Sequence, residues 1–322
     1  MQSLTIPTPP LAIFGHAEPV RQTHVRLFDN PTELAGYAGD LLRTGKGKER
    51  DASSRDWNDE KNSSQAIVTF QTGDLSGVAK SDALLRQFED RALVTHRPLW
   101  VADVAGPLPN VPAYLAGHPL AMKRRVRGGH EGAPIAIVVD IGAASMIERD
   151  QIERRGAAIL ALLRVLSARR PVELWAGAIL DADECKNASA HFCRLDTAPL
   201  DLARASYILT NPAAIRGCLW TCADAFGFTA YSPYGAGQAH CRYTAELLGP
   251  AFQNTADTIF LGRISHQDDE SIASPETWLE RKLCEALPED GREPPPPFVK
   301  PAKPIGPTYT PAASRHRRRR RY

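Results

Sequence analysis

The residues whose type and spacing most clearly suggest chemistry are the arginines that close the chain. Six of them stand among the last eight residues: Arg315, Arg317, Arg318, Arg319, Arg320 and Arg321. A guanidinium can hold a phosphate through two parallel hydrogen bonds, and a run of like charge is typical of a tail that binds a polyanion. The formal net charge of the whole chain is only +2, so positive charge is concentrated at one end. We therefore expect nucleic acid or another polyanion as partner; a solvated tail that only aids solubility is the alternative.

A second basic cluster lies inside the chain. It consists of Lys123, Arg124, Arg125 and Arg127, between a proline-rich stretch and a pair of glycines. One interpretation is a phosphate contact on the body that works together with the tail. The other is an ordinary solvated loop, because a short basic run is weak evidence for a binding site.

Cysteine and histidine residues are candidates for a metal site. Cys185, His191 and Cys193 are close together in the sequence, and Cys218 and Cys222 follow. Their spacing matches no standard zinc motif. Because free cysteine is commonly buried as a small apolar residue, we expect Cys218 and Cys222 on the buried side of a helix. We predict no metal and no cofactor.

Catalytic motifs are not evident in the sequence. There is no G-x-S-x-G elbow and no H-E-x-x-H pair. His266 with Asp268, Asp269 and Glu270 follows an expected strand and could form a ligand cluster, although such groups are more often solvated loops. An enzyme, such as a metal-dependent hydrolase, is therefore the less favoured class.

The elements that would position these residues are clearest from residue 134 onward. Residues 134–140 are almost continuously apolar, which predicts a strand buried on both faces of a parallel sheet. Residues 148–169 show apolar positions at helical spacing, and residues 171–180 predict the next strand. Strand, helix and strand with short links indicate a parallel crossover unit. We expect a further strand over 257–264.

Several helices are expected around this unit. Helix-start signals lie at Asn30 with Pro31, near Ser63, and at Ser274 with Pro275. Residues 199–226 should also be helical, with an interruption at Asn211. The fold class predicted is α/β, with a three-layer and mostly parallel sheet, a helical N-terminal region and a disordered C-terminal tail.

The segment over 135–180 resembles the opening of a von Willebrand factor A-type domain. In that family an apolar strand ends in a D-x-S-x-S motif that helps to hold a divalent metal. Asp140 keeps the first position here, whereas Gly142 and Ala144 replace the two serines and Ser145 stands one place late. Glycine and alanine supply no oxygen ligand, so the resemblance implies an A-domain-like, Rossmann-like fold with a degenerate metal site at Asp140 and Ser145.

The chain is also similar to uncharacterised proteins of bacteriophages and mobile elements. Three motifs carry this resemblance: V-P-x-[YF]-L-A-G-x-P-x-x-M at Val111–Met122, R-G-A-A-x-x-A-L at Arg155–Leu162, and [RP]-V-E-L-W at Pro171–Trp175. The likeness spans roughly residues 30–285. It implies a phage-like context and no particular reaction.

We expect four regions along the chain. Residues 1–29 should be an extended lead-in, and 30–130 a mainly helical and irregular region packed on the sheet domain. Residues 131–288 should form the A-domain-like domain. Residues 289–322, rich in proline and arginine, should form a disordered spacer and tail.

Location and function follow from these patterns as expectations. No apolar run of about 18 residues suggests a membrane span, and the first residues lack the features of a signal peptide. We expect a cytoplasmic protein, in the host cytoplasm or a virion if a phage encodes it, with no membrane partner. The favoured function is a non-enzymatic scaffold that associates with nucleic acid through its tail. The alternative is a protein-interaction module that uses the carboxyl edge of the sheet.

Overall fold

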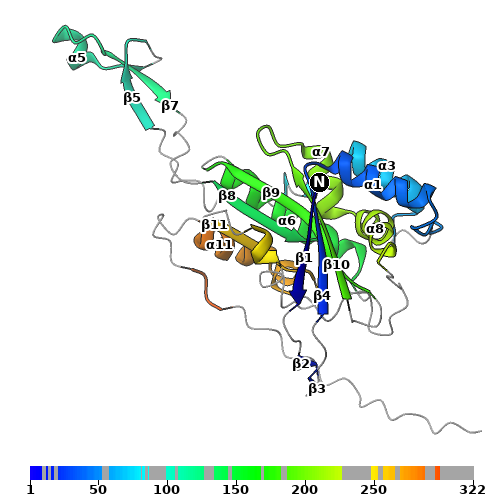
Figure 1. The fold of residues 1–322 in the computed structure, drawn as a ribbon. Coiled ribbons are helices and arrows are strands. Elements are labelled where there is room, and N and C mark those ends of the chain that lie inside the picture. Colours follow the sequence, from blue (N-terminus) through cyan, green and yellow to red (C-terminus); the bar gives the residue numbers. More distant parts are fainter. Residues whose placement is uncertain are drawn as a thin grey trace, which may run out of the picture.

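A six-stranded sheet forms the centre of the molecule (Figure 1). The structure, a computed structural model, describes residues 1–8, 12–13, 16–17, 21–52, 58–80, 82–83, 86, 99–105, 108–126, 134–143, 147–167, 170–182, 187–226, 248–252, 257–264, 269–286 and 294–297. In spatial order the strands are β1 (Gln2–Thr8), β4 (Arg21–Phe28), β10 (Asn187–Leu195), β9 (Val172–Ala182), β8 (Ile135–Asp140) and β11 (Asp257–Leu261). The pairs β4–β10, β9–β8 and β8–β11 are parallel, while β1–β4 and β9–β10 are antiparallel. The expected α/β class with a mostly parallel sheet is confirmed.

The predicted strand–helix–strand unit is present. Strand β8 is buried along its whole length, and helix α6 (Arg149–Ser167) connects it to its parallel neighbour β9. Alternate residues of β8 face opposite sides: Ile137 and Val139 contact the helical side, and Val138 contacts the other side. This double burial explains the nearly continuous apolar sequence.

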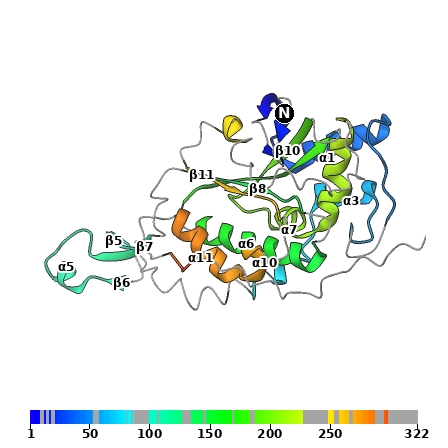
Figure 2. The same ribbon diagram turned by 90° about the horizontal axis from the view of Figure 1, so that it is seen from below.

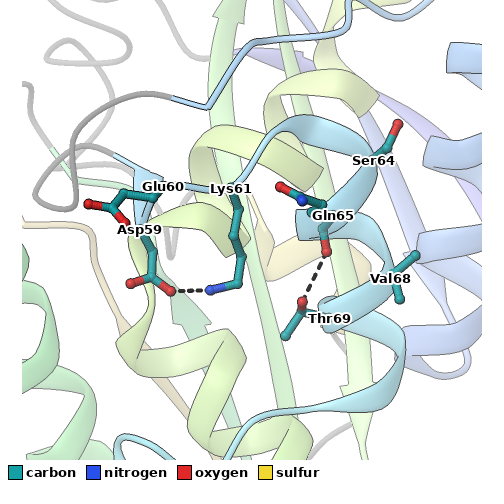
Figure 3. A pocket seen from close by; sticks show the side chains of 7 residues that line it. All are labelled: Asp59, Glu60, Lys61, Ser64, Gln65, Val68 and Thr69. Atoms are coloured by element: carbon teal, nitrogen blue, oxygen red, sulfur yellow. Dashed lines mark hydrogen bonds and ion pairs between the residues drawn. The ribbon is translucent and has the colours of Figure 1, made fainter.

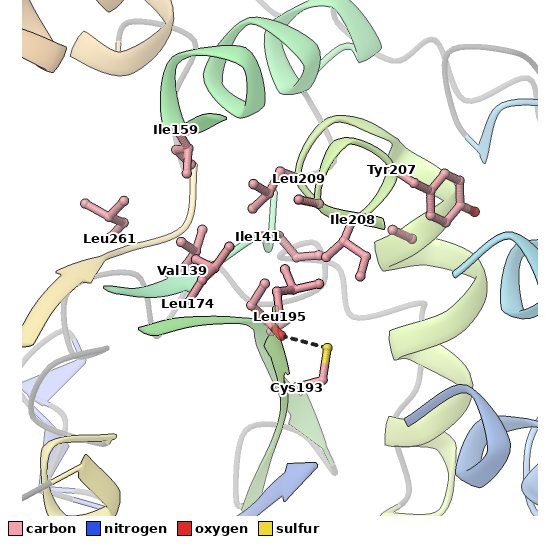
Figure 4. Close-up of a cluster of buried hydrophobic side chains, with 14 of the residues drawn as sticks. Val139, Ile141, Ile159, Leu174, Cys193, Leu195, Tyr207, Ile208, Leu209 and Leu261 are labelled. Carbon is pink, nitrogen blue, oxygen red and sulfur yellow. Dashed lines mark hydrogen bonds between the residues drawn. The ribbon is translucent and has the colours of Figure 1, made fainter. Parts of the chain in front are cut away.

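The described helices gather on one face of the sheet (Figure 2). Besides α6 they are α1 (Pro31–Arg43), α3 (Ser63–Thr72), α7 (Leu202–Thr210), the π-helix η2 (Ala214–Leu219), α8 (Trp220–Asp224), α10 (Glu270–Ala273) and α11 (Pro275–Ala286). Their apolar side chains meet those of the sheet in one large core, part of which is shown in Figure 4. On the opposite face, Phe252 of the short helix η3 (Gly249–Phe252) and the preceding Leu248 pack on the sheet. Within the described ranges, no second layer of long helices covers that face.

Local signals explain why these helices begin and end where they do. Asn30 caps α1 by accepting the N–H of Glu33 at 2.9 Å. Asn62 and Gln65 form a capping box at the start of α3. Helix α7 ends at Thr210, as expected from the interruption at Asn211.

Close contact between α6 and α7 depends on a glycine. A Cβ atom at Gly156 would overlap the carbonyl oxygen of Leu209. The absence of a side chain therefore lets the end of α7 lie against α6, and any larger residue would force the two helices apart.

Three strands of the large sheet were not predicted. The expected lead-in contains β1 and β4, which extend the sheet beyond β10. Pro7 stands in β1, where an edge strand tolerates a missing donor. Strand β10 carries Ser189, His191 and Cys193 at the positions facing the helices, so it lacks a clear apolar alternation.

A small sheet lies apart from the six-stranded sheet in both views (Figures 1 and 2). Its strands are β5 (Leu99–Asp103), β7 (Met122–Val126) and β6 (Leu108–Pro109), in that order, and the short helix α5 (Val111–Leu115) lies between β6 and β7. This region was expected to be helical or irregular, because its prolines obscure the strand pattern. A further short pair joins β2 (Ala12–Ile13) to β3 (His16–Ala17).

The start of the proline-rich spacer contacts the body. Arg281 of α11 binds Glu270 and also donates to the carbonyl oxygens of Pro295 and Pro296, at 3.4 and 3.0 Å. The remainder of the expected tail lies outside the described residues, and the predicted domain boundaries stay predictions. Within the described part of the chain, no helix has both the length and the apolar character needed to cross a bilayer.

Candidate functional site

The carboxyl edge of the sheet brings Asp140 into a buried setting. Asp140 is the last residue of β8, between β9 and β11, and none of it is exposed. Its Oδ1 accepts the N–H of Gly142 at 2.8 Å. Its Oδ2 has no hydrogen-bond partner within the described residues. The sequence therefore predicted the position of this carboxylate, but its surroundings decide what it can do.

Two buried arginines act electrostatically on this carboxylate. Arg155 of α6 donates to the carbonyl oxygens of Asp140, at 3.1 Å, and of Gly262. Arg155 and Arg263 are both almost fully buried. Burial raises the pKa of Asp140, and the positive charges of Arg263 and Arg155 oppose that shift. A guanidinium thus supplies the positive charge that a metal ion would provide.

A further carboxylate acts on the first of these arginines, Arg155. Asp269 caps α10. Burial lowers the pKa of the Arg155 guanidinium, and the negative charges of Asp269 and Asp140 oppose that shift. The cluster of Asp140, Asp269, Arg155 and Arg263 therefore contains two negative and two positive groups. We call it the Asp140 cluster.

The geometry around Gly142 does not suit the metal motif that the resemblance suggested. A Cβ atom at this position would lie 2.8 Å from Oδ1 of Asp140 and 3.7 Å from Cζ of Arg263. A serine here would therefore displace the carboxylate, and the guanidinium already lies beside it. Ser145, the other candidate ligand, lies outside the described residues. The residues present fit an internal ion cluster better than a divalent cation.

A second polar network surrounds Asp59. Its carboxylate accepts from Asn211 at 2.9 Å and also binds Lys61 and Arg149, the first residue of α6. Burial would raise the pKa of Asp59, but the hydrogen bonds from Lys61 and Asn211 and the charge of Arg149 outweigh it and lower the pKa. The network links the N-terminal region to the start of α6 and the end of α7.

An open pocket adjoins this network (Figure 3). It has a volume of about 620 Å³ and lies between residues 59–61 and residues 64–69 of α3. Asp59 and Glu60 at its border both adopt the left-handed backbone conformation, each with φ of 57°. Such conformations cost about 1–3 kcal/mol for residues other than glycine and often occur at functional sites. No pattern in the sequence predicted this pocket.

A third group of polar residues lies between the sheet and α1. His191 of β10 pairs in register with Arg26 of β4. The guanidinium of Arg26 lies 4.6 Å from the ring centre of Tyr37 and 5.2 Å from that of Phe226. Both ring nitrogens of His191 are buried without a hydrogen-bond partner in the described structure. Burial, and secondarily the charge of Arg26, lower the pKa of His191 to about 3.

The cysteines near His191 behave as buried apolar residues. Cys193, Cys218 and Cys222 are free and buried, which confirms the expectation for the latter two. Burial raises the pKa of the Cys193 and Cys218 thiols, so these two carry a proton at neutral pH and are poor metal ligands. Cys185 lies outside the described residues. Among the residues that the structure describes, no three His, Cys, Asp or Glu side chains converge as a metal site would require.

The basic residues predicted to bind nucleic acid are only partly described. Lys123, Arg124 and Arg125 follow one another on β7, and Lys123 is half-buried. Arg127 lies outside the described residues, as do all six tail arginines, Arg315, Arg317, Arg318, Arg319, Arg320 and Arg321. His266 and Asp268 also fall outside them, while Asp269 and Glu270 take structural roles in α10.

Comparison with known proteins places the chain in a family without assigning an activity. Neither the curated proteins nor the solved structures gave a significant match. One family model matches residues 16–284, which include the small sheet and all strands of the large sheet except β1. The chain therefore belongs to the family described as a domain of unknown function (DUF7192).

Proposed function

We propose that this protein is a non-enzymatic scaffold of phage type, with a degenerate A-domain-like body, that associates with nucleic acid through its arginine-rich tail. The observation that carries the proposal is the concentration of six arginines within residues 315–321 of a chain with a net charge of only +2. Binding of such a tail to phosphates releases counterions, so the affinity is sequence-independent and falls steeply with salt.

The body supports the scaffold part of this proposal. Strands β10, β9, β8 and β11 are adjacent, with β8 joined to β9 through α6 and β9 antiparallel to β10. In this proposal the body is a degenerate A-type domain, and its support is the parallel β8–α6–β9 unit. The Asp140 cluster balances its own charges, and a serine at Gly142 would displace the carboxylate. In A-type domains this edge of the sheet carries the metal. The charge balance of the Asp140 cluster and the lack of room for a serine at Gly142 favour a structural role for the edge here.

A protein-interaction module is the second candidate. The observation in its favour is the open pocket beside Asp59 and Glu60, whose left-handed conformations store strain near the start of α6. In this alternative the pocket and the nearby carboxyl edge of the sheet bind a segment of a partner protein.

Nucleic-acid binding across a salt series tests the proposal. We compare the wild-type chain, a variant with all six tail arginines changed to glutamine, and the variant Lys123→Gln/Arg124→Gln/Arg125→Gln. The six tail arginines can make up to six phosphate contacts. A plot of the logarithm of the wild-type binding constant against the logarithm of the salt concentration should then have a slope of about −5 for duplex DNA and about −4 for single strands. The tail variant should lose most of this affinity and most of the slope.

Two other results would change the assignment. Equal binding by the tail variant and the wild type, with loss in the β7 variant, would identify β7 as the nucleic-acid surface. If none of the three proteins binds, the polyanion proposal fails and the protein-interaction module becomes the leading candidate.

A further inference from the structure

Exposed apolar side chains are concentrated at one end of the small sheet. Six of the ten large apolar residues that are exposed in the described structure lie in residues 104–121, which we call the tip: Val104, Leu108, Val111, Tyr114, Leu115 and Leu120. Tyr114 and Leu115 of α5 are the most exposed, at 71% and 79%. Water therefore surrounds a cluster of side chains that normally gains stability from burial.

The distribution of charge in this region is uneven. Residues 104–122 include no Asp, Glu, Lys or Arg. Lys123, Arg124 and Arg125 follow immediately on β7, and Asp103 is the only acidic residue within 99–126. The small sheet thus combines an uncharged apolar tip with a basic strand directly behind it.

We propose that the tip docks on an anionic lipid surface. Its aliphatic side chains and Tyr114 enter the boundary between headgroups and acyl chains, where an amphipathic tyrosine is favoured. The positive charge of β7 attracts anionic lipids. This inference goes beyond the proposed function and does not depend on it.

The other possible occupants fit the tip less well. A stable protein interface uses about 20–30 residues from each partner, whereas the tip exposes six large apolar side chains and projects from the small sheet (Figure 1). Single-stranded nucleic acid stacks its bases on aromatic rings, and five of these six side chains are aliphatic. Two copies packed tip to tip would bring their basic strands together and repel each other.

A peripheral contact is compatible with the absence of a spanning helix in the described structure. The expectation of no membrane partner rested on the lack of a spanning segment in the sequence. A surface that buries only a few side chains needs no such segment.

Vesicle sedimentation of the full-length protein tests this proposal. The vesicles contain either phosphatidylcholine alone or equal parts of phosphatidylcholine and phosphatidylserine. The tip variant is Tyr114→Ser/Leu115→Ser, and the matched control is Val68→Ser/Leu75→Ser, whose two residues are 59% and 58% exposed outside the tip. Since the arginine tail also attracts anionic vesicles, each measurement is repeated with the tail arginines changed to glutamine and at about 1 M salt, where the Debye length is about 3 Å.

The wild type should bind the mixed vesicles more tightly than the neutral ones, and part of its binding should persist at high salt and without the tail charges. The tip variant should bind roughly 10–100-fold more weakly, while the control remains like the wild type. Equal binding by the tip variant, complete loss on removal of the tail charges, or no binding by the wild type would overturn the proposal. So would a dimer of the wild type that the tip variant abolishes in analytical ultracentrifugation, because the tip would then join two copies.

Discussion

The carboxyl edge of the large sheet and the tip of the small sheet place opposite kinds of side chain in unfavourable surroundings. At the edge, Asp140, Arg155 and Arg263 are charged groups almost completely withdrawn from water. At the tip, Tyr114 and Leu115 are large apolar groups left in it. The first arrangement is compensated within the molecule, because each charge has an opposite charge nearby. The second has no compensation within the described residues.

This difference separates a structural site from an interaction site. A buried cluster that neutralises itself joins β8, β11, α6 and α10 and leaves little for a ligand to gain. An exposed apolar cluster gains free energy only when something covers it. Changes at the edge should therefore alter the stability of the protein, and changes at the tip should alter binding alone.

The largest effect is expected for Arg155→Met. This substitution removes a buried charge, leaves Asp140 less compensated and takes two hydrogen bonds from the carbonyl oxygens of Asp140 and Gly262. A hydrogen bond from a charged group typically contributes about 1.5–3 kcal/mol, so loss of the two should cost about 3–5 kcal/mol. The free energy of unfolding, measured by urea denaturation, should fall by that amount.

The neighbouring Arg154 offers a matched control. Arg154 pairs with Asp150 on the surface of the same helix and is half exposed. Arg154→Met should change the free energy of unfolding by no more than about 1 kcal/mol. Equal destabilisation by both substitutions would mean that the Asp140 cluster has no special role.

An intermediate effect is expected from His191 as the pH falls. The folded protein holds His191 neutral with a pKa of about 3, whereas the ordinary value is 6.5. The unfolded chain therefore binds more protons, and stability is lost progressively below about pH 6.5. Between pH 8 and pH 5 this one residue should lower the free energy of unfolding by about 2 kcal/mol.

His191→Leu should remove that part of the pH dependence. The control is His118→Leu, at an exposed histidine of the tip, which should keep the wild-type dependence. Urea unfolding at the two pH values distinguishes them. If the leucine variant at 191 lost stability in acid as steeply as the wild type, the burial of His191 would not be responsible.

The smallest effect on stability is expected for Leu115→Ser at the tip. Because Leu115 is 79% exposed, its replacement removes little packing, and the free energy of unfolding should stay within about 0.5 kcal/mol of the wild type. A loss above about 1 kcal/mol in urea denaturation would show that the tip supports the fold and would end the contrast with the Asp140 cluster.

The sequence predicted the central part of the fold because its elements have strong periodic patterns. Strand β8, helix α6 and strand β9 all carry apolar residues at the positions that burial requires. Strand β10 was missed because Ser189, His191 and Cys193 occupy its buried positions. Strands β1 and β4 were missed because pairing between distant segments leaves little local signal.

The candidate site was less predictable for a similar reason. Asp140 was found from its place at the end of an apolar run. Arg155 and Arg263 were not, because they lie 15 and 123 residues further along the chain and only the fold brings them to Asp140. Nothing in the sequence marked residues 104–121 as exposed, since prolines and apolar residues are equally typical of a packed loop.

The contact between Arg281 and the spacer gives the tail a fixed origin. Arg281 holds the carbonyl oxygens of Pro295 and Pro296, so this part of the spacer lies against α11. Arg315 follows Pro297 by 18 residues, so it can lie at most about 60–65 Å away. In the proposed function, any polyanion that these arginines bind would therefore be held within that distance of the body, at a raised local concentration.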